Sequence, residues 1–381
     1  MQGLVDLVTS EPPPLRYTVD EIIQSGQRVR RRRRTGWMTS GVTVVAAVGV
    51  VAAVAVPSLT RAAVPPTTVG PAGPSADLAA STDAAPAFPV AAQPFTFSFD
   101  GYRVGRLRVA QPIDVSTAYE LASVYADGLT TNDRPADPNQ PPPTRQVPTL
   151  YGYLTVYRPG AYIPWKLANA HRVSVAGRPG LEVDDTAGGW AAKRTLAWQY
   201  GTNAWAVINA GSTGADYPSA EDVRRLAAGL RPATPRAAKV PFTMTYVPPG
   251  YHLDEVAMHA MTGLDGIAVA REGDYAGLLF SRPAQPTIGL TAPFGGVDGA
   301  DPPGSFNVFV VPAGTANQKP SPGVTCGQGF CNRWAAGGSV NLQVASGGRL
   351  SNAEMTKVLN GIRLGNVHDD GTWAEVGTAI P

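Results

Sequence analysis

Charged residues, histidine and cysteine are scarce in this chain of 381 residues. Charged residues make up 16% of it, and it has four histidines and two cysteines, whereas globular domains carry roughly 25% charged residues. So few cysteines and histidines argue against a tetrahedral zinc site, which takes four such ligands. After residue 57 the charges balance, with twenty-four basic and twenty-five acidic groups. That balance argues against nucleic-acid binding, which needs a basic surface.

Sequence motifs of common catalytic sites are also missing. The chain has no Gly-x-Ser-x-Gly turn, no glycine-rich phosphate loop and no His-Glu-x-x-His motif. His252 and His259 bracket two acids, but on a strand they would point to opposite faces, which favours strand-edge histidines over a metal site. Asp184-Asp185 and Asp369-Asp370 indicate turns, with calcium binding as the alternative. We therefore expect no enzymatic activity and no cofactor, and an envelope hydrolase is the least favoured alternative.

An arginine run beside an apolar segment is the strongest feature that is present. Arg30, Arg31, Arg32, Arg33 and Arg34 directly precede the segment 37–56, which has twenty uncharged residues. A helix of that length spans a hydrocarbon core of about 30 Å. Seven cations precede the segment, and one follows it within forty-six residues. This asymmetry predicts a single-pass plasma-membrane protein with a cytoplasmic N-terminus and an extracytoplasmic C-terminal domain, its arginines on anionic lipid.

Two other interpretations of residues 37–56 stay open. Ala53-Val54-Ala55 offers the small-residue cleavage site of a secretory signal peptide, and Arg33-Arg34 allow a twin-arginine export signal. The apolar run exceeds the roughly 7–15 residues of a signal peptide. Its length favours a retained signal-anchor.

The segments beside this predicted anchor have little apolar periodicity. Residues 1–36 form a basic tail that is either disordered and sets the topology or, over 19–34, a helix that docks a cytoplasmic partner. Residues 57–93 are rich in proline, alanine, serine and threonine. Because such a segment cannot bury enough apolar surface to fold, we expect an extended stalk.

The remaining chain contains an internal repeat. Residues 94–99 and 241–246 both alternate apolar and polar side chains, the pattern of a half-buried strand. Each copy closes with a strand, a turn and a helix, and each helix begins at a serine, Ser219 or Ser351, with an acid three residues later. A further helix is predicted over 115–126, among several strands.

These elements predict an α+β fold: two tandem copies of an antiparallel-sheet-plus-helix module after one transmembrane helix. The first module covers residues 94–233 and the second 239–366. A polar tail follows at 367–381.

Cys326 and Cys331 flank the sequence Gly-Gln-Gly-Phe. In an exported domain, a closely spaced pair indicates a disulfide rather than a metal site, since no further ligand lies nearby. The bridge closes a very short loop, so it would stabilise the fold by about 2 kcal/mol.

Aromatic residues gather in the first module. The candidates for a ligand platform are Tyr151, Tyr153, Tyr157, Trp165, Trp198 and Trp205. The three tyrosines share one parity, which predicts one strand face. Packing inside the core is the favoured interpretation, and a platform for glycan, lipid or peptide is the alternative.

Three of these features together resemble a known group of proteins. Trp198 and Trp205 flank a strand, a helix follows at 219–231, and Pro248-Pro249-Gly250-Tyr251 forms a turn motif. The pattern resembles the extracytoplasmic modules of bacterial anti-sigma-type and sporulation-type single-pass membrane proteins, which are distantly like lipoprotein-carrier folds. Over residues 94–366, the resemblance implies a curved antiparallel sheet with helices and an apolar groove.

The cytoplasmic part departs from the anti-sigma pattern, because no His-x-x-x-Cys-x-x-Cys motif precedes residue 37. We therefore expect a non-enzymatic envelope protein whose outer domain binds or senses a protein, lipid or glycan. The alternative is a structural or assembly factor that contacts other envelope proteins.

Overall fold

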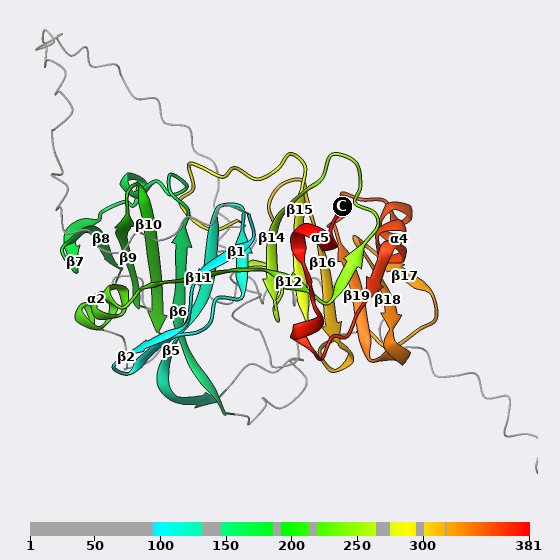
Figure 1. Ribbon diagram of the computed structural model, residues 1–381, viewed down its shortest axis with the longest axis horizontal. Coiled ribbons are helices and arrows are strands. Elements are labelled where there is room, and N and C mark those ends of the chain that lie inside the picture. The colour runs from blue at the N-terminus through cyan, green and yellow to red at the C-terminus, as the bar shows by residue number, and fades with distance from the viewer. Residues whose placement is uncertain are drawn as a thin grey trace, which may run out of the picture.

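The computed structural model of the protein describes residues 94–131, 146–185, 192–212, 219–263, 275–294, 301–316 and 318–381. Within these ranges one antiparallel sheet of fifteen strands runs along the long axis of the molecule (Figure 1). Its main path is β17-β18-β19-β16-β15-β14-β4-β5-β6-β10-β9-β8-β7, and the hairpin β2-β3 joins it at β5.

The first half of the chain contributes β1 (Thr96–Phe99), β2 (Tyr102–Val104), β3 (Leu107–Val109), β4 (Asp114–Ser116), β5 (Tyr119–Thr131), β6 (Gln146–Tyr157), η1 (Pro164–Lys166), β7 (His171–Val175), β8 (Arg178–Asp185), β9 (Ala192–Gly201), β10 (Ala204–Ser212), α2 (Ala220–Ala228) and β11 (Pro232–Ala237).

The second half contributes β12 (Lys239–Val240), β13 (Phe242–Met244), β14 (His252–Met258), β15 (Ala276–Ser281), β16 (Ser305–Pro312), η2 (Ala313–Thr315), β17 (Val324–Gly327), β18 (Phe330–Ala335), η3 (Ala336–Gly338), β19 (Val340–Ala345), α4 (Asn352–Gly361), β20 (Ile362–Leu364), η4 (Asp370–Thr372), β21 (Ala374–Glu375) and α5 (Val376–Ala379).

The predicted α+β class is wrong, because the described residues are mostly antiparallel strand. The helices α2 and α4 have nine and ten residues, α5 has four, and they accompany a sheet of fifteen strands. The predicted helix at 115–126 lies in β4 and β5 instead. Strand β5 buries Leu121 on one face and Ala122 on the other. A strand that is apolar on both faces loses its two-residue alternation and imitates helical spacing.

Both predicted helix starts are confirmed. The Ser219 hydroxyl accepts a hydrogen bond from the Asp222 backbone N–H at 3.0 Å, and the Asp222 carboxylate accepts one from the Ser219 N–H at 3.2 Å. Ser351 and Glu354 form the same reciprocal pair. Such capping boxes satisfy N–H groups that have no partner inside the helix. Figure 1 shows α2 near the β7 end of the sheet and α4 near the β17 end.

The sheet has apolar clusters on both faces. One face carries two large cores, the first packed under α2 and the second under α4. Alternate residues build the opposite face, because neighbours on a strand point in opposite directions. We call this group the rear cluster; it includes Tyr119, Tyr157, Tyr162, Leu290 and Phe294. Chain segments from both halves contribute to the rear cluster.

The predicted disulfide between Cys326 and Cys331 is confirmed. It joins directly opposite residues of β17 and β18, at one end of the sheet. The predicted membrane segment 37–56, the arginine run and the stalk lie outside the described residues. Within the described ranges, no helix has the length and apolar character to cross a bilayer.

Candidate functional site: paired loops above a buried acid pair

The aromatic candidates are distributed over different environments. Tyr151 and Trp198 belong to the core under α2, and Tyr157 belongs to the rear cluster. Tyr153 and Trp205 pack, partly buried, against the rear cluster. Trp165 is 78% exposed. The structure therefore brings these residues together in no single surface.

The expectation that Tyr151, Tyr153 and Tyr157 share a face is wrong for Tyr151. On β6, Gly152 pairs with Val124 and Leu150 pairs with the next residue of β5, so Tyr151 is the extra residue of a bulge. A bulge shifts the alternation of side chains by one position. Tyr151 consequently points into the core under α2, away from the other two tyrosines.

Two loops from the two halves of the chain are joined beside the rear cluster. The Trp165 loop spans residues 158–170 and the Ile288 loop spans residues 282–294. Tyr162 and Leu290 form an isolated parallel bridge. The Ile163 N–H donates to the Leu290 carbonyl at 2.8 Å, and the Leu290 N–H donates to the Ala161 carbonyl at 2.8 Å. The backbone bonds hold the two loops in register.

The paired loops expose apolar side chains. Trp165 and Ile288, exposed to 78% and 68%, are the large exposed apolar residues of the described surface. The exposed Lys166 lies next to Trp165, and neither loop contains an acidic residue. We call Trp165, Lys166 and Ile288 the loop patch. Because the bonded loops lie together, these side chains form a candidate interaction surface.

Tyr119 supports both loops from below. Its ring contacts the ring of Phe294, with centroids 5.1 Å apart, and the ring of Tyr157, with centroids 5.9 Å apart. Tyr157 in turn packs on Tyr162 of the Trp165 loop at 4.8 Å. The Tyr119 hydroxyl also accepts a hydrogen bond from the Phe294 N–H at 2.9 Å. Tyr119 thus links the two loops through its ring and its hydroxyl.

Asp114 and Glu255 form a buried acid pair next to Tyr119. Both side chains have no exposed surface. They come from β4 and β14, the two strands that join the halves of the sheet. The Tyr119 hydroxyl donates to Glu255 Oε2 at 2.6 Å. The Gly263 N–H donates to Glu255 Oε1 at 2.6 Å and to Asp114 Oδ2 at 2.9 Å.

The environment of the pair favours one shared proton over two negative charges. Burial, and then the negative charge of Glu255, raise the pKa of Asp114 well above its ordinary value. Burial also raises the pKa of Glu255, while hydrogen bonds from Asp114 and Tyr119 act in the opposite direction. The stronger upward shift at Asp114 favours the protonated form there, with Glu255 as the acceptor of its hydrogen bond. Two like charges this close cannot both be ionised cheaply in a dry interior.

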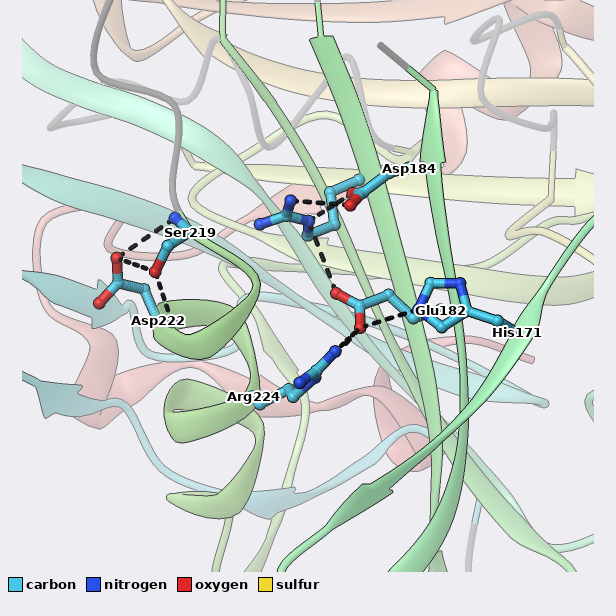
Figure 2. A network of polar contacts seen from close by, with 7 residues as sticks. His171, Glu182, Asp184, Ser219, Asp222 and Arg224 are labelled. Atoms are coloured by element: carbon cyan, nitrogen blue, oxygen red, sulfur yellow. Dashed lines mark hydrogen bonds and ion pairs between the residues drawn. The ribbon is translucent and has the colours of Figure 1, made fainter.

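A second buried acid, Glu182, is balanced by cations instead. Arg224 of α2 donates to Glu182 Oε2 from Nε at 3.0 Å and from Nη2 at 2.5 Å. Arg194 lies 3.5 Å from Glu182 Oε1 and donates to both oxygens of Asp184. Figure 2 shows Glu182 between Arg224 and His171, whose ring nitrogen is 3.6 Å away. This network fastens α2 to β8 and β9.

The remaining polar candidates have structural partners. His259 lies 2.8 Å from Asp370 and stacks on Trp373, so it holds the C-terminal segment on the sheet. His252 is exposed at the start of β14. In the part of the chain that the structure describes, no three His, Cys, Asp or Glu residues are grouped to hold a metal ion.

Sequence reasoning found Trp165 but missed Ile288, Tyr119 and the acid pair. Asp114 and Glu255 belong to different predicted modules, 141 positions apart in the sequence, and no local pattern connects them. A weak signal was available: Asp114 and Glu255 each adjoin a valine that is fully buried. Neighbouring residues of a strand point to opposite faces of the sheet. If both faces of the sheet are covered, an acid next to a buried valine is therefore buried as well, on the other face.

Comparison with known proteins gives little further information. No protein family model and no curated protein sequence matches the chain. Among solved structures, MucB in complex with MucA(peri) is similar over 71% of this chain and 93% of that chain, with 13% identity and a TM-score of 0.19. The MucA/MucB complex of Pseudomonas aeruginosa covers the same shares, with 14% identity and a TM-score of 0.20. TM-scores this low support no conclusion about the fold or the function of this chain.

Proposed function

We propose that this chain is a non-enzymatic, single-pass envelope protein whose extracytoplasmic domain binds another envelope protein through the loop patch. The observation that carries the proposal is the exposure of Trp165 and Ile288 on two loops that are bonded to each other and anchored on the rear cluster. A rigid support lowers the entropy cost of binding, since the loops need little ordering.

The chemistry of the loop patch indicates the kind of partner. Trp165 and Ile288 offer apolar contact area, and Trp is enriched at binding hot spots. Lys166 adds an exposed cation, and the two loops contain no acid. The complementary surface is an apolar protein segment with acidic residues at its edge.

The location of the domain rests on the amino-acid sequence. The arginine run and the uncharged segment 37–56 support an anchor with a cytoplasmic N-terminus. The disulfide between Cys326 and Cys331 supports an oxidising compartment for the folded part.

Site-specific photo-crosslinking in native membranes tests the proposal. A photoreactive amino acid at position 165 or 288 of the full-length protein should form a crosslink with one protein species. The same group at Asn360, an exposed residue of α4 on the face opposite the rear cluster, is the matched control. Crosslinks to lipid from positions 165 and 288, or the same products from all three positions, would contradict a protein-binding patch.

A further inference from the structure

The acid pair is connected to both loops through Tyr119. Glu255 accepts hydrogen bonds from Tyr119, from Gly263 and from the protonated Asp114. Tyr119 connects Glu255 to the Ile288 loop, because its hydroxyl also accepts a hydrogen bond from the Phe294 N–H of that loop. A continuous path of hydrogen bonds therefore runs from Asp114 through Glu255 and Tyr119 to the Ile288 loop.

We propose that the proton held between Asp114 and Glu255 is a latch for the loop patch, closed while the proton is bound and opened when the proton is lost. This inference rests on the proposed function and adds its regulation. Asp114 Oδ1 is buried and accepts no hydrogen bond from a described N–H or hydroxyl group, and the one Gly263 N–H reaches both carboxyl groups. Without the proton, two carboxylates face each other at the joint between β4 and β14.

The surroundings of the pair contain no described group that would neutralise a second charge. The titratable neighbours are Tyr119 from β5 and Asp254 from β14. Asp254 acts against a negative charge on Glu255, while Tyr119 is a neutral donor whose one hydroxyl hydrogen already bonds to Glu255. Next to Gly263, Thr262 donates to Asn307 of β16, whose amide donates to Asp301. None of these groups is a cation. We expect ionisation of Asp114 to push Glu255 away, so that Tyr119 loses the acceptor that fixes its hydroxyl.

The direction of the pH effect follows from the raised pKa of Asp114. The folded protein binds a proton that the unfolded chain releases at lower pH. The stabilisation of the closed latch is complete below the ordinary pKa of an aspartate and is lost as pH rises through the raised value. We expect the Ile288 loop to become mobile on the alkaline side.

The test measures the mobility of a spin label attached to the thiol of Ile288→Cys in the full-length protein, from pH 5 to pH 10. The native cysteines are joined in a disulfide and do not react with the label. We expect the mobile fraction to increase at least twofold with pH. Asp114→Asn should keep the label immobile throughout, because the amide donates to Glu255 and carries no titrating proton. Tyr119→Phe should leave it mobile at every pH.

Glu120→Gln is the matched control, because Glu120 is also a buried carboxyl but belongs to a hydrogen-bond group with Ser98. It should keep the pH response of the parent protein. The latch would be overturned if the mobility of the label stayed constant from pH 5 to pH 10 while circular dichroism showed an intact fold. It would also be overturned if the mobility of the label in Asp114→Asn changed with pH as it does in the parent protein. No partner takes part in this measurement, so a failed latch and a failed docking site are distinguishable.

Discussion

Glu182 in the first half of the sheet and the Asp114–Glu255 pair at its centre are all fully buried, but they are stabilised in opposite ways. Two arginines and a histidine surround Glu182, whereas the acid pair relies on a proton and on neutral donors. Fixed cations offset the charge of a buried carboxylate directly. A carboxyl pair that depends on a proton is sensitive to pH. The first arrangement suits the attachment of a helix, and the second suits control of the loops.

The largest expected effect is the loss of a cation beside Glu182. Arg194→Met should destabilise the fold by about 3–5 kcal/mol, because it leaves a buried carboxylate with incomplete compensation. Urea unfolding at pH 7 measures this change. Arg103→Met removes a cation from an exposed pair with Asp127 and should cost at most about 1 kcal/mol. Equal losses in the two variants would contradict the stabilising role of the cations at Glu182.

The next effect concerns Glu120, which accepts hydrogen bonds from Ser98 and lies near Arg158 and Arg236. Burial raises the pKa of Glu120 from 4.5 to about 7. The folded protein therefore holds a proton that the unfolded chain loses above pH 4.5. Relative to Glu120→Gln, the parent protein should lose about 3 kcal/mol of stability between pH 4.5 and 7. Chemical denaturation over that range checks it, and parallel stability curves would contradict it.

The two ends of the sheet should differ in their dependence on a covalent link. Strands β17 and β18 are joined by Cys326 and Cys331, while β7 at the other end pairs only with β8. Replacing both cysteines by serine should cost about 2 kcal/mol. Hydrogen exchange should show the faster opening in β17 and β18, with β7 unchanged. A uniform increase over the whole sheet would indicate that the bridge supports the complete fold.

The smallest effect on stability is expected at the loop patch. Trp165→Ala and Ile288→Ala should change the free energy of unfolding by no more than about 0.5 kcal/mol, because both side chains are exposed. Trp198→Ala removes a buried ring of the core under α2 and should cost about 3–5 kcal/mol. Thermal unfolding compares the three variants. A large loss from Trp165→Ala would show that this residue serves the fold and not a partner.

Local patterns in the sequence predict several elements well and the relation between them poorly. The serine-acid spacing at Ser219 and Ser351 predicts both helix starts, since a capping box is a local interaction. The strand expected before the first of these helices is also found, as β10, although both of its faces are covered. The same reasoning fails at 115–126, where the apolar residues on the two faces of β5 imitate helical spacing.

The candidate site depends almost entirely on contacts between distant segments. Trp165 could be selected from the sequence as an aromatic residue, but the bridge between Tyr162 and Leu290, which joins its loop to the Ile288 loop, could not. The acid pair requires β4 to meet β14. The bulge at Tyr151 also depends on pairing, because neighbouring strands set where an extra residue is accommodated.

The most direct test of the docking claim is carbene footprinting of the full-length protein, compared between native membranes and the purified state. Trp165 and Ile288 should be labelled in the purified protein and at least fivefold less in membranes, because the partner covers them. Asn360, exposed on α4, should be labelled equally in both. Equal labelling of Trp165 and Ile288 in the two states would contradict the proposed docking surface.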